Sequence, residues 1–167
     1  TAGKIHGYEN FKFKRFTGNN GYLRCYSCGY LLFKSSEAEM IERIRGTILK
    51  KEPNAVVLDV NGVGLKIYMS INCLESTPTV GKVTQILTYL NVKEDILDLY
   101  GFLSDNERET FLNLISISGI GPKLALNILS GITTDNLKNS IIAGDVASLT
   151  RVPGVGAKTA KRIIVEL

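Results

Sequence analysis

Two kinds of hydrophobic pattern divide most of the chain. In residues 40–103, apolar and polar positions alternate in short runs, as expected for β-strands with one face in a core. From residue 104 onward, apolar residues recur at intervals of three and four, which indicates amphipathic helices. We therefore predict an α+β multidomain chain, with a β-barrel domain at 40–103 and an all-α domain at 104–167. Residues 1–39 follow neither pattern and are treated as an N-terminal extension.

The alternating segment contains turn signals that separate five predicted strands. Asn61-Gly62 is the strongest of them, because this dipeptide favours the backbone angles of a two-residue hairpin turn. Residues 71–80 are expected to be a connector. Five short strands with glycine bends favour a small Greek-key barrel of the OB type, and an SH3-like barrel is the alternative. The predicted strands are Met40–Leu49, Ala55–Val60, Leu65–Ser70, Val83–Val92 and Ile96–Phe102.

The helical segment opens with a capping box. In Ser104-x-x-Glu107, the serine side chain accepts from a free amide of the first turn, and the glutamate is expected to reach back to the serine amide. Apolar residues then continue at helical spacing. A connecting helix is predicted at Asp135–Ala143, with Thr133 or Thr134 as its cap.

A glycine-rich stretch occurs twice in this segment. SGIGPKLALNIL at 118–129 and PGVGAKTAKRII at 153–164 align at a fixed offset along the chain, which indicates two copies of one supersecondary unit. Each copy is predicted to be a helix, a glycine hairpin and a second helix. The plainer alternative is a pair of glycine-stopped helices in a bundle. The alignment matches two glycines and a lysine of each copy: Gly119, Gly121 and Lys123 with Gly154, Gly156 and Lys158.

Each hairpin leads into a helix whose first amide groups lack partners within the helix. Together with the helix dipole, these amides form a site for an anion such as phosphate. Lys158, Lys161 and Arg162 place cations near the second hairpin, as Lys123 does near the first. Backbone amides with cations suit the phosphate backbone of nucleic acid and carry no base information. GVGAKT is not a nucleotide-binding P-loop, because Ala157 precedes the lysine where that motif requires glycine.

Two adjacent carboxylates, Glu94 and Asp95, lie between the fourth and fifth predicted strands. Such a pair at a hairpin tip is most often a solvated turn. Beside a nucleic-acid-binding module, however, the two charges repel phosphate and steer strands apart.

Residues 1–39 contain one half of a zinc-binding pattern. Cys25 and Cys28 have the C-x2-C spacing found in zinc-ribbon proteins, but a closed tetrahedral site needs four ligands. His6 and Cys73, the other histidine and cysteine of the chain, are not spaced as a second pair. We therefore expect no bound metal and little fixed structure here, and Met40 resembles a natural start of the folded protein.

Composition adds limits rather than a function. The net charge of +4 is modest, so the case for nucleic acid depends on where the cations lie. No apolar run is long enough to span a membrane, and no signal-peptide pattern opens the chain. Three cysteines, an odd number, do not suggest a secreted disulfide framework. We expect a cytoplasmic protein without a cofactor.

Five stretches of residues 40–167 together match the pattern of a known family: MIERIRGTI, VNGVGLKIYM, VKEDILDLYGF, SGIGPKLALNILSG and PGVGAKTAKRIIVEL. Through them, residues 40–167 resemble the RuvA family of bacterial Holliday-junction-binding subunits. The resemblance implies a non-catalytic subunit that binds four-way DNA junctions during branch migration in recombination and repair. It also implies a homotetramer formed through the barrels, and a RuvB-type ATPase as partner of a third, C-terminal domain. The given sequence stops at Leu167 within a predicted helix, so we expect that domain to be missing.

The resemblance also implies roles for individual residues. In the family, an acidic pin separates strands at the junction centre, and the residues that match it are Glu94 and Asp95. The hairpins of the family bind the minor-groove backbones of the four arms. The matching residues here are Gly119, Ile120, Gly121, Lys123, Gly154, Val155, Gly156 and Lys158, with Lys161 and Arg162 close by.

Two other functions are weighed against this one. A helix-hairpin-helix repair glycosylase or lyase would place a catalytic lysine or aspartate just beyond a hairpin, in a pocket completed by a second helical domain. A zinc-ribbon regulator of nucleic acid would make residues 1–39 the dominant part. The sequence shows no composite active site, although the family is one part of an ATP-dependent helicase complex.

Overall fold

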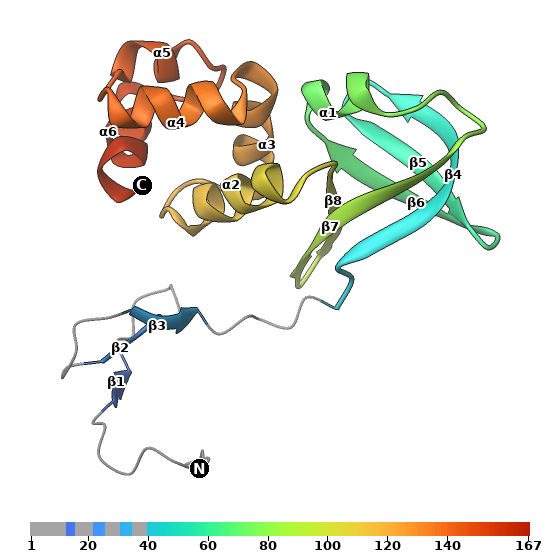
Figure 1. The fold of residues 1–167 in the computed structure, drawn as a ribbon, viewed down its shortest axis with the longest axis horizontal. Helices are drawn as coiled ribbons and strands as arrows, with labels where there is room; N and C mark the ends of the chain where they lie inside the picture. Colours follow the sequence, from blue (N-terminus) through green and yellow to red (C-terminus); the bar gives the residue numbers. More distant parts are fainter. Residues whose placement is uncertain (1–12, 16–21, 26–30, 35–39) are drawn as a thin grey trace. The chain divides into compact units, whose positions relative to one another are not determined.

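The computed structural model describes residues 13–15, 22–25, 31–34 and 40–167 (Figure 1). The chain divides into two compact units, Thr1–Ala38 and Glu39–Leu167. The first unit holds an antiparallel sheet in the order β1-β2-β3. Its strands are β1 (Phe13–Arg15), β2 (Tyr22–Cys25) and β3 (Leu31–Lys34). Cys25 ends β2, whereas Cys28 lies outside the described residues, so the C-x2-C prediction stays a prediction.

The second unit begins with a closed five-stranded barrel, which confirms the predicted OB-type fold. The strand order is β4-β5-β6-β8-β7, and β4 pairs with both β5 and β7. All neighbours are antiparallel except β6 and β8, which pair in parallel through Tyr68 and Tyr100. This Greek-key order is that of an OB barrel, so the SH3-like alternative is set aside. The strands are β4 (Arg43–Glu52), β5 (Ala55–Val60), β6 (Val63–Met69), β7 (Val83–Lys93) and β8 (Ile96–Phe102).

The predicted hairpin turn between β5 and β6 is present. Asn61 and Gly62 have φ angles of 52° and 87°, as a two-residue turn of this kind requires. The Gly62 amide also donates to Asp59 Oδ1 at 2.8 Å. The turn fixes the register of the two strands, so that the inward side chains Val56, Leu58 and Ile67 are fully buried.

The predicted connector at 71–80 contains a short helix that the hydrophobic pattern did not predict. Helix α1 (Ile71–Ser76) is capped by Ser70, whose Oγ accepts from the amide of Cys73 at 3.2 Å. Its apolar side chains Cys73 and Leu74 are buried in the core of the barrel. The segment is too short to show a helical period, so only the cap serine signals it.

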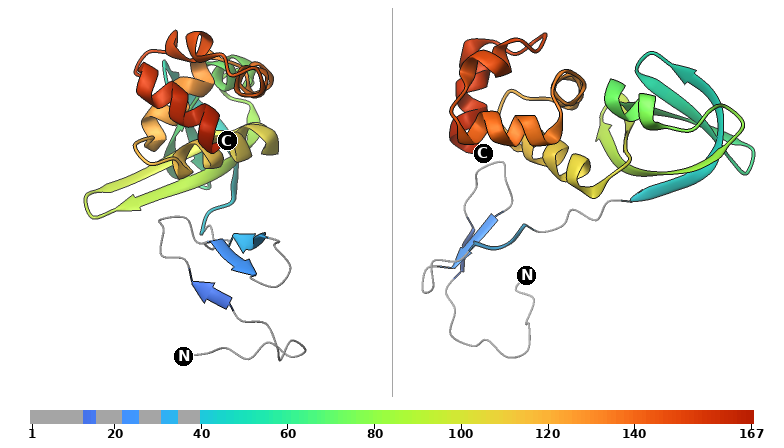
Figure 2. Two further views of the ribbon diagram at one scale, coloured as in Figure 1. Left: turned by 90° about the vertical axis from the view of Figure 1, so that its left-hand side faces the viewer. Right: turned by 45° about the horizontal axis from the view of Figure 1, so that its top comes forward.

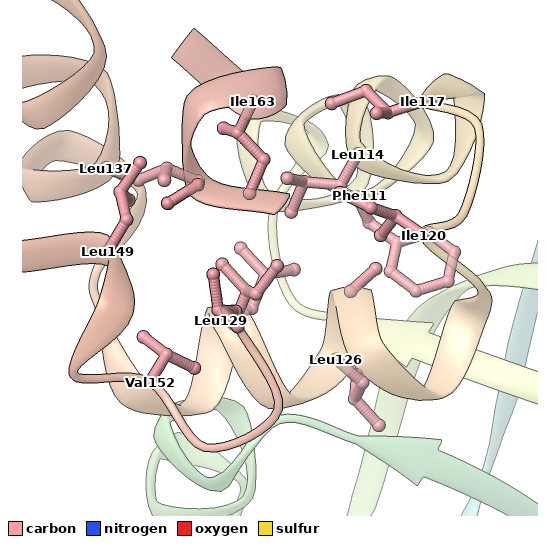
Figure 3. Packing of buried hydrophobic residues seen from close by; sticks show 14 of the residues in the cluster. Phe111, Leu114, Ile117, Ile120, Leu126, Leu129, Leu137, Leu149, Val152 and Ile163 are labelled. Carbon is pink, nitrogen blue, oxygen red and sulfur yellow. The ribbon is translucent and has the colours of Figure 1, made fainter. Parts of the chain in front are cut away.

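Five helices follow the barrel. Ser104, Thr133 and Asp145 cap α2, α4 and α5 through their side chains. Figure 3 shows the apolar side chains of these helices converging on one core, with Leu114, Leu137 and Ile163 fully buried. The helices are α2 (Asp105–Ser116), α3 (Pro122–Gly131), α4 (Thr134–Ile142), α5 (Val146–Thr150) and α6 (Ala157–Glu166). Among the described helices, none has the length and apolar character needed to cross a membrane.

One half of the predicted capping box is wrong. Ser104 does accept from the amide of Glu107, at 3.3 Å. The Glu107 carboxylate, however, accepts from Ser70 Oγ at 2.8 Å and from Cys73 Sγ at 2.6 Å, both of which belong to the α1 region. A tertiary contact therefore replaces the local one that the sequence suggested.

The barrel and the helices share a hydrophobic core. Phe111 of α2 is fully buried against three aromatic rings of the barrel, with centroid distances of 5.5 Å to Tyr89, 5.5 Å to Tyr100 and 4.9 Å to Phe102. Aromatic pairs of this geometry each contribute about 0.5–1.5 kcal/mol beyond the burial of their area. The predicted division between residues 103 and 104 therefore runs beside a well-packed interface, and the independence of the two domains stays a prediction.

Candidate nucleic-acid interface

The first glycine hairpin joins α2 to α3 through a tight turn. Gly119 has a φ of 89°, a conformation that a residue with a side chain rarely adopts. The amide of Ile120 donates to the carbonyl of Ile117 at 3.0 Å and closes the turn. Gly121 is the N-cap of α3, and its carbonyl accepts the first helical hydrogen bond, from Ala125 at 3.0 Å.

The second hairpin, between α5 and α6, repeats this geometry. Gly154 has a φ of 90°, and the amide of Val155 donates to the carbonyl of Val152 at 3.0 Å. Gly156 is the N-cap of α6 and accepts from Ala160 at 2.9 Å. The sequence repeat thus corresponds to a structural repeat, and the prediction of two helix-hairpin-helix units is confirmed.

The middle residue of each glycine hairpin is buried and holds the turn against the helical core. The side chains of Ile120 and Val155 are only 4% and 6% exposed and belong to the helical core. Their amide hydrogens are also engaged within the turns. The groups that each hairpin presents to solvent therefore come from its flanking glycines and from the start of the following helix.

The helices that follow the hairpins lack the caps found on the others. Within residues 40–167, α3 and α6 have no side-chain hydrogen bond at the N-cap. Apart from the glycine itself and its two chain neighbours, no described residue lies within 4 Å of the place where a Cβ of Gly121 or Gly156 would stand. Pro122 at the start of α3 carries no N–H, so the uncapped amides begin at Lys123 in α3 and at Ala157 in α6, and no side-chain cap competes with an anion for them. The helices with capped N-termini are α1, α2, α4 and α5.

Exposed cations lie beside these two helix N-termini. Lys123 in the first turn of α3 is exposed, as are Lys158 and Lys161 in α6. They are well placed to neutralise phosphates held by the amides. Arg151, an exposed cation at the C-cap of α5, lies just before the second hairpin and lines an open pocket there. Arg151 was not among the predicted site residues, although its closeness to Gly154 was a usable indication.

Arg162 makes intramolecular contacts with the first hairpin and with its own helix. Its Nη1 donates to the carbonyl of Ser118 in the first hairpin, and its Nε lies 3.7 Å from Glu166 Oε1. In the other direction, a Cβ added to Gly154 would lie 3.1 Å from Leu124 of α3. Each hairpin thus packs against the helix that follows the other, which holds the two uncapped N-termini in one arrangement.

The two predicted pin residues form the tip of the β7–β8 hairpin. Lys93 pairs with Ile96, so Glu94 and Asp95 are the two turn residues, and both are exposed. Figure 2 shows this hairpin extending beyond the rest of the barrel. Val92 and Leu97, 65% and 74% exposed, lie opposite each other just below the tip. The acidic turn therefore lies at the end of a two-stranded arm formed by β7 and β8, apart from the two glycine hairpins.

Comparison with known proteins agrees with this geometry. Residues 40–101 match the family described as RuvA N terminal domain, and residues 111–167 match the SAM-like helix-hairpin-helix tandem. Residues 40–167 belong to the RuvA family. The predicted resemblance is thus confirmed for the barrel and for the tandem hairpins together.

Three curated RuvA proteins show how far the similarity extends. Each is named Holliday junction branch migration complex subunit RuvA, and each aligns over 128 residues, or 77% of this chain. The identity is 48% to the protein of Pseudomonas syringae pv. syringae (strain B728a), 47% to that of Pseudomonas putida and 46% to that of Marinomonas sp. (strain MWYL1). The alignments cover 63%, 62% and 64% of these relatives, so the chain spans less than two thirds of their length.

The predicted site residues fall into two groups in this structure. The glycines and lysines of both hairpins gather on the paired helix N-termini, whereas Glu94 and Asp95 lie apart on the barrel arm. In the described part of the chain, no group of three or more His, Cys, Asp or Glu side chains is arranged to hold a metal ion.

Proposed function

We propose that this chain binds four-way DNA junctions, as the DNA-binding subunit of a branch-migration complex in recombination and repair. The observation that supports the proposal best is the duplicated hairpin with an uncapped helix N-terminus and an exposed lysine in each copy. Two anion sites held at a fixed spacing suit two phosphate groups along a nucleic-acid backbone. The names of the RuvA relatives support the choice of a junction over a plain duplex.

The remaining parts of the proposal rest on family membership. Four copies of the barrel arm would bring Glu94 and Asp95 together at the centre of a homotetramer, where the carboxylates act as a pin between strands. A RuvB-type ATPase would act with a protein of this family, and the cytoplasm is the proposed location. The chain itself contributes binding, and the motor contributes ATP hydrolysis.

The test compares binding of a four-way junction and of a duplex with the same arm sequences, by fluorescence anisotropy at several salt concentrations. Lys158→Ala should weaken binding to all sequences alike and reduce the slope of log K against log salt by about one unit. Lys123→Ala should act in the same direction. Lys138→Ala is the matched control, since Lys138 is an exposed lysine of α4 outside both hairpins.

The proposal fails if the wild-type protein binds duplex as tightly as junction. It also fails if Lys158→Ala changes the salt slope no more than Lys138→Ala does, because the hairpin lysine would then not contact phosphate.

A further inference from the structure

Helix α1 is bonded to the helical segment as well as to the barrel that contains it. The side-chain amide of Asn72 donates to the carbonyl of Leu129 at 2.8 Å, and the amide of Ile71 donates to Ser130 Oγ at 3.1 Å. Both acceptors belong to the last turns of α3. In Figure 1, α1 lies on the side of the barrel that is nearest to α3. The short helix therefore bridges the two parts of the unit.

The Glu107 carboxylate completes this bridge from α2. One of its oxygens accepts from Ser70 Oγ and the other from Cys73 Sγ, and these two donors are 0% and 4% exposed. Burial raises the pKa of the Cys73 thiol to about 12, and the hydrogen bond to Glu107 adds to the rise. The thiol therefore stays protonated and able to donate at neutral pH. Both oxygens of one carboxylate are thus engaged by the α1 region.

The first two turns of α2 contact the barrel at further places. Arg108 Nη1 lies 4.0 Å from Glu42 Oε1, next to the start of β4. One turn later, Phe111 packs against the rings of Tyr89 and Phe102. Tyr89 and Phe102 lie on β7 and β8, the strands whose connecting turn is Glu94-Asp95. Strands β7 and β8 carry the acidic turn at one end and contact Phe111 of α2, and α2 leads into the first glycine hairpin. The acidic turn is therefore connected to that hairpin through packed side chains.

We propose that Glu107 is a positioning residue for junction recognition. Through Ser70 and Cys73 it holds the helix-hairpin-helix segment at a fixed orientation to the barrel. That orientation sets the spacing between the acidic turn and the two phosphate-binding hairpins. The inference rests on the proposed function, because a junction presents its centre and its arms at a defined spacing whereas a duplex has no centre to match.

The central experiment replaces Glu107 by glutamine in the full chain. In Glu107→Gln, an NH2 group takes the place of one carboxylate oxygen. The amide is neutral and only its remaining oxygen accepts, so the hydrogen bonds from Ser70 and Cys73 lose the charge that strengthened them, and one of the two groups faces an NH2 donor in place of an acceptor. Glu109→Gln is the matched control, because Glu109 lies on the same helix, is exposed and carries the same charge. Any general gain in DNA affinity from removing a negative charge appears in both variants.

Two measurements are made on both variants. Hydrogen exchange of the backbone amides in 71–77 and 105–111 should become about threefold to tenfold faster in Glu107→Gln and stay unchanged in Glu109→Gln. The ratio of duplex Kd to junction Kd should fall by about threefold to tenfold in Glu107→Gln, with little change in duplex Kd relative to the control.

If Glu107→Gln does not fold, a second pair of variants tests the same inference. Cys73→Ala removes one donor to the carboxylate, whereas Cys73→Ser retains a hydroxyl donor at the same place. The alanine variant should lose junction selectivity, and the serine variant should restore most of it. A role in core packing alone would predict the same loss in both, because both replacements remove the sulfur.

The outcomes separate this inference from the proposed function. Unchanged exchange in Glu107→Gln overturns the bridge, and faster exchange with unchanged selectivity overturns the positioning role. If the wild-type protein shows no preference for a junction, the proposed function fails and the positioning role fails with it. In that case, faster exchange in Glu107→Gln still shows that the carboxylate couples the barrel to the helices.

Discussion

At the scale of single residues, the hairpin glycines show how little freedom the site allows. Gly154 has a positive φ, and a Cβ at this position would also lie 3.1 Å from Leu124. Gly156, two residues later, has a φ of −83° and open space around its Cβ position. Of these two glycines, only Gly154 is required by conformation and packing, whereas the backbone at Gly156 would accept a side chain.

This difference leads to a prediction for stability. Gly154→Ala should lower the free energy of unfolding by about 1–3 kcal/mol, because the alanine is strained at positive φ. Gly156→Ala should cost less than about 1 kcal/mol, since its backbone angles suit any residue and only its N-cap preference is lost. Urea denaturation of both variants measures the two values. Equal losses at the two positions would contradict the assignment of strain to Gly154.

The sequence predicted residues well where their neighbours along the chain decide their role. Asn61-Gly62 and the paired glycines belong to that class, because a turn is fixed by a few consecutive residues. Glu107 does not, since its partners Ser70 and Cys73 are brought to it only by the folded barrel. Arg162 was expected near phosphate, and its bond to Ser118 likewise depends on how the two hairpins pack.

At the scale of elements, the β7–β8 arm separates the acidic turn from the basic hairpins. Strands were predicted from alternation with small errors at their ends, for example Met40–Leu49 for β4 at Arg43–Glu52. The arm itself was not predicted, because alternation does not show how far two paired strands extend past a barrel. Its length matters for the proposed function, since it places Glu94 and Asp95, with Lys93 beside them, beyond the rest of the barrel (Figure 2).

The arm gives a second prediction. Glu94→Gln combined with Asp95→Asn removes both charges and keeps the shape of the turn. Each repulsive contact with a phosphate costs on the order of 1 kcal/mol at reduced dielectric, and a duplex across the centre meets these contacts directly. Duplex binding should therefore tighten more than junction binding, and the selectivity should narrow. Measuring the junction and duplex affinities at two salt concentrations tests this. An unchanged preference for junction over duplex would mean that the two carboxylates only form a solvated turn.

At the scale of the whole molecule, the two compact units differ in their relation to the family. The unit Glu39–Leu167 contains all residues that match RuvA, whereas Thr1–Ala38 lies outside both matches. We therefore expect a chain that begins at Met40 to fold and to bind junctions as the full chain does. Thermal unfolding and junction affinity of the two chains check this. Zinc bound in a one-to-one ratio, or unfolding on chelation, would contradict it, because structural zinc contributes directly to folding.

The way the barrel closes also determines how this molecule reaches its folded state. Closure pairs Arg43 with Leu87 and Tyr68 with Tyr100, residues far apart along the chain, whereas each glycine hairpin closes between near neighbours. Contacts between distant residues must overcome more loop-closure entropy and form more slowly. The hairpins are thus able to form early but lack the aromatic surface of β8 on which Phe111 packs. On this argument, closure of the barrel is the slow step, and the helix-hairpin-helix segment packs fully only after it.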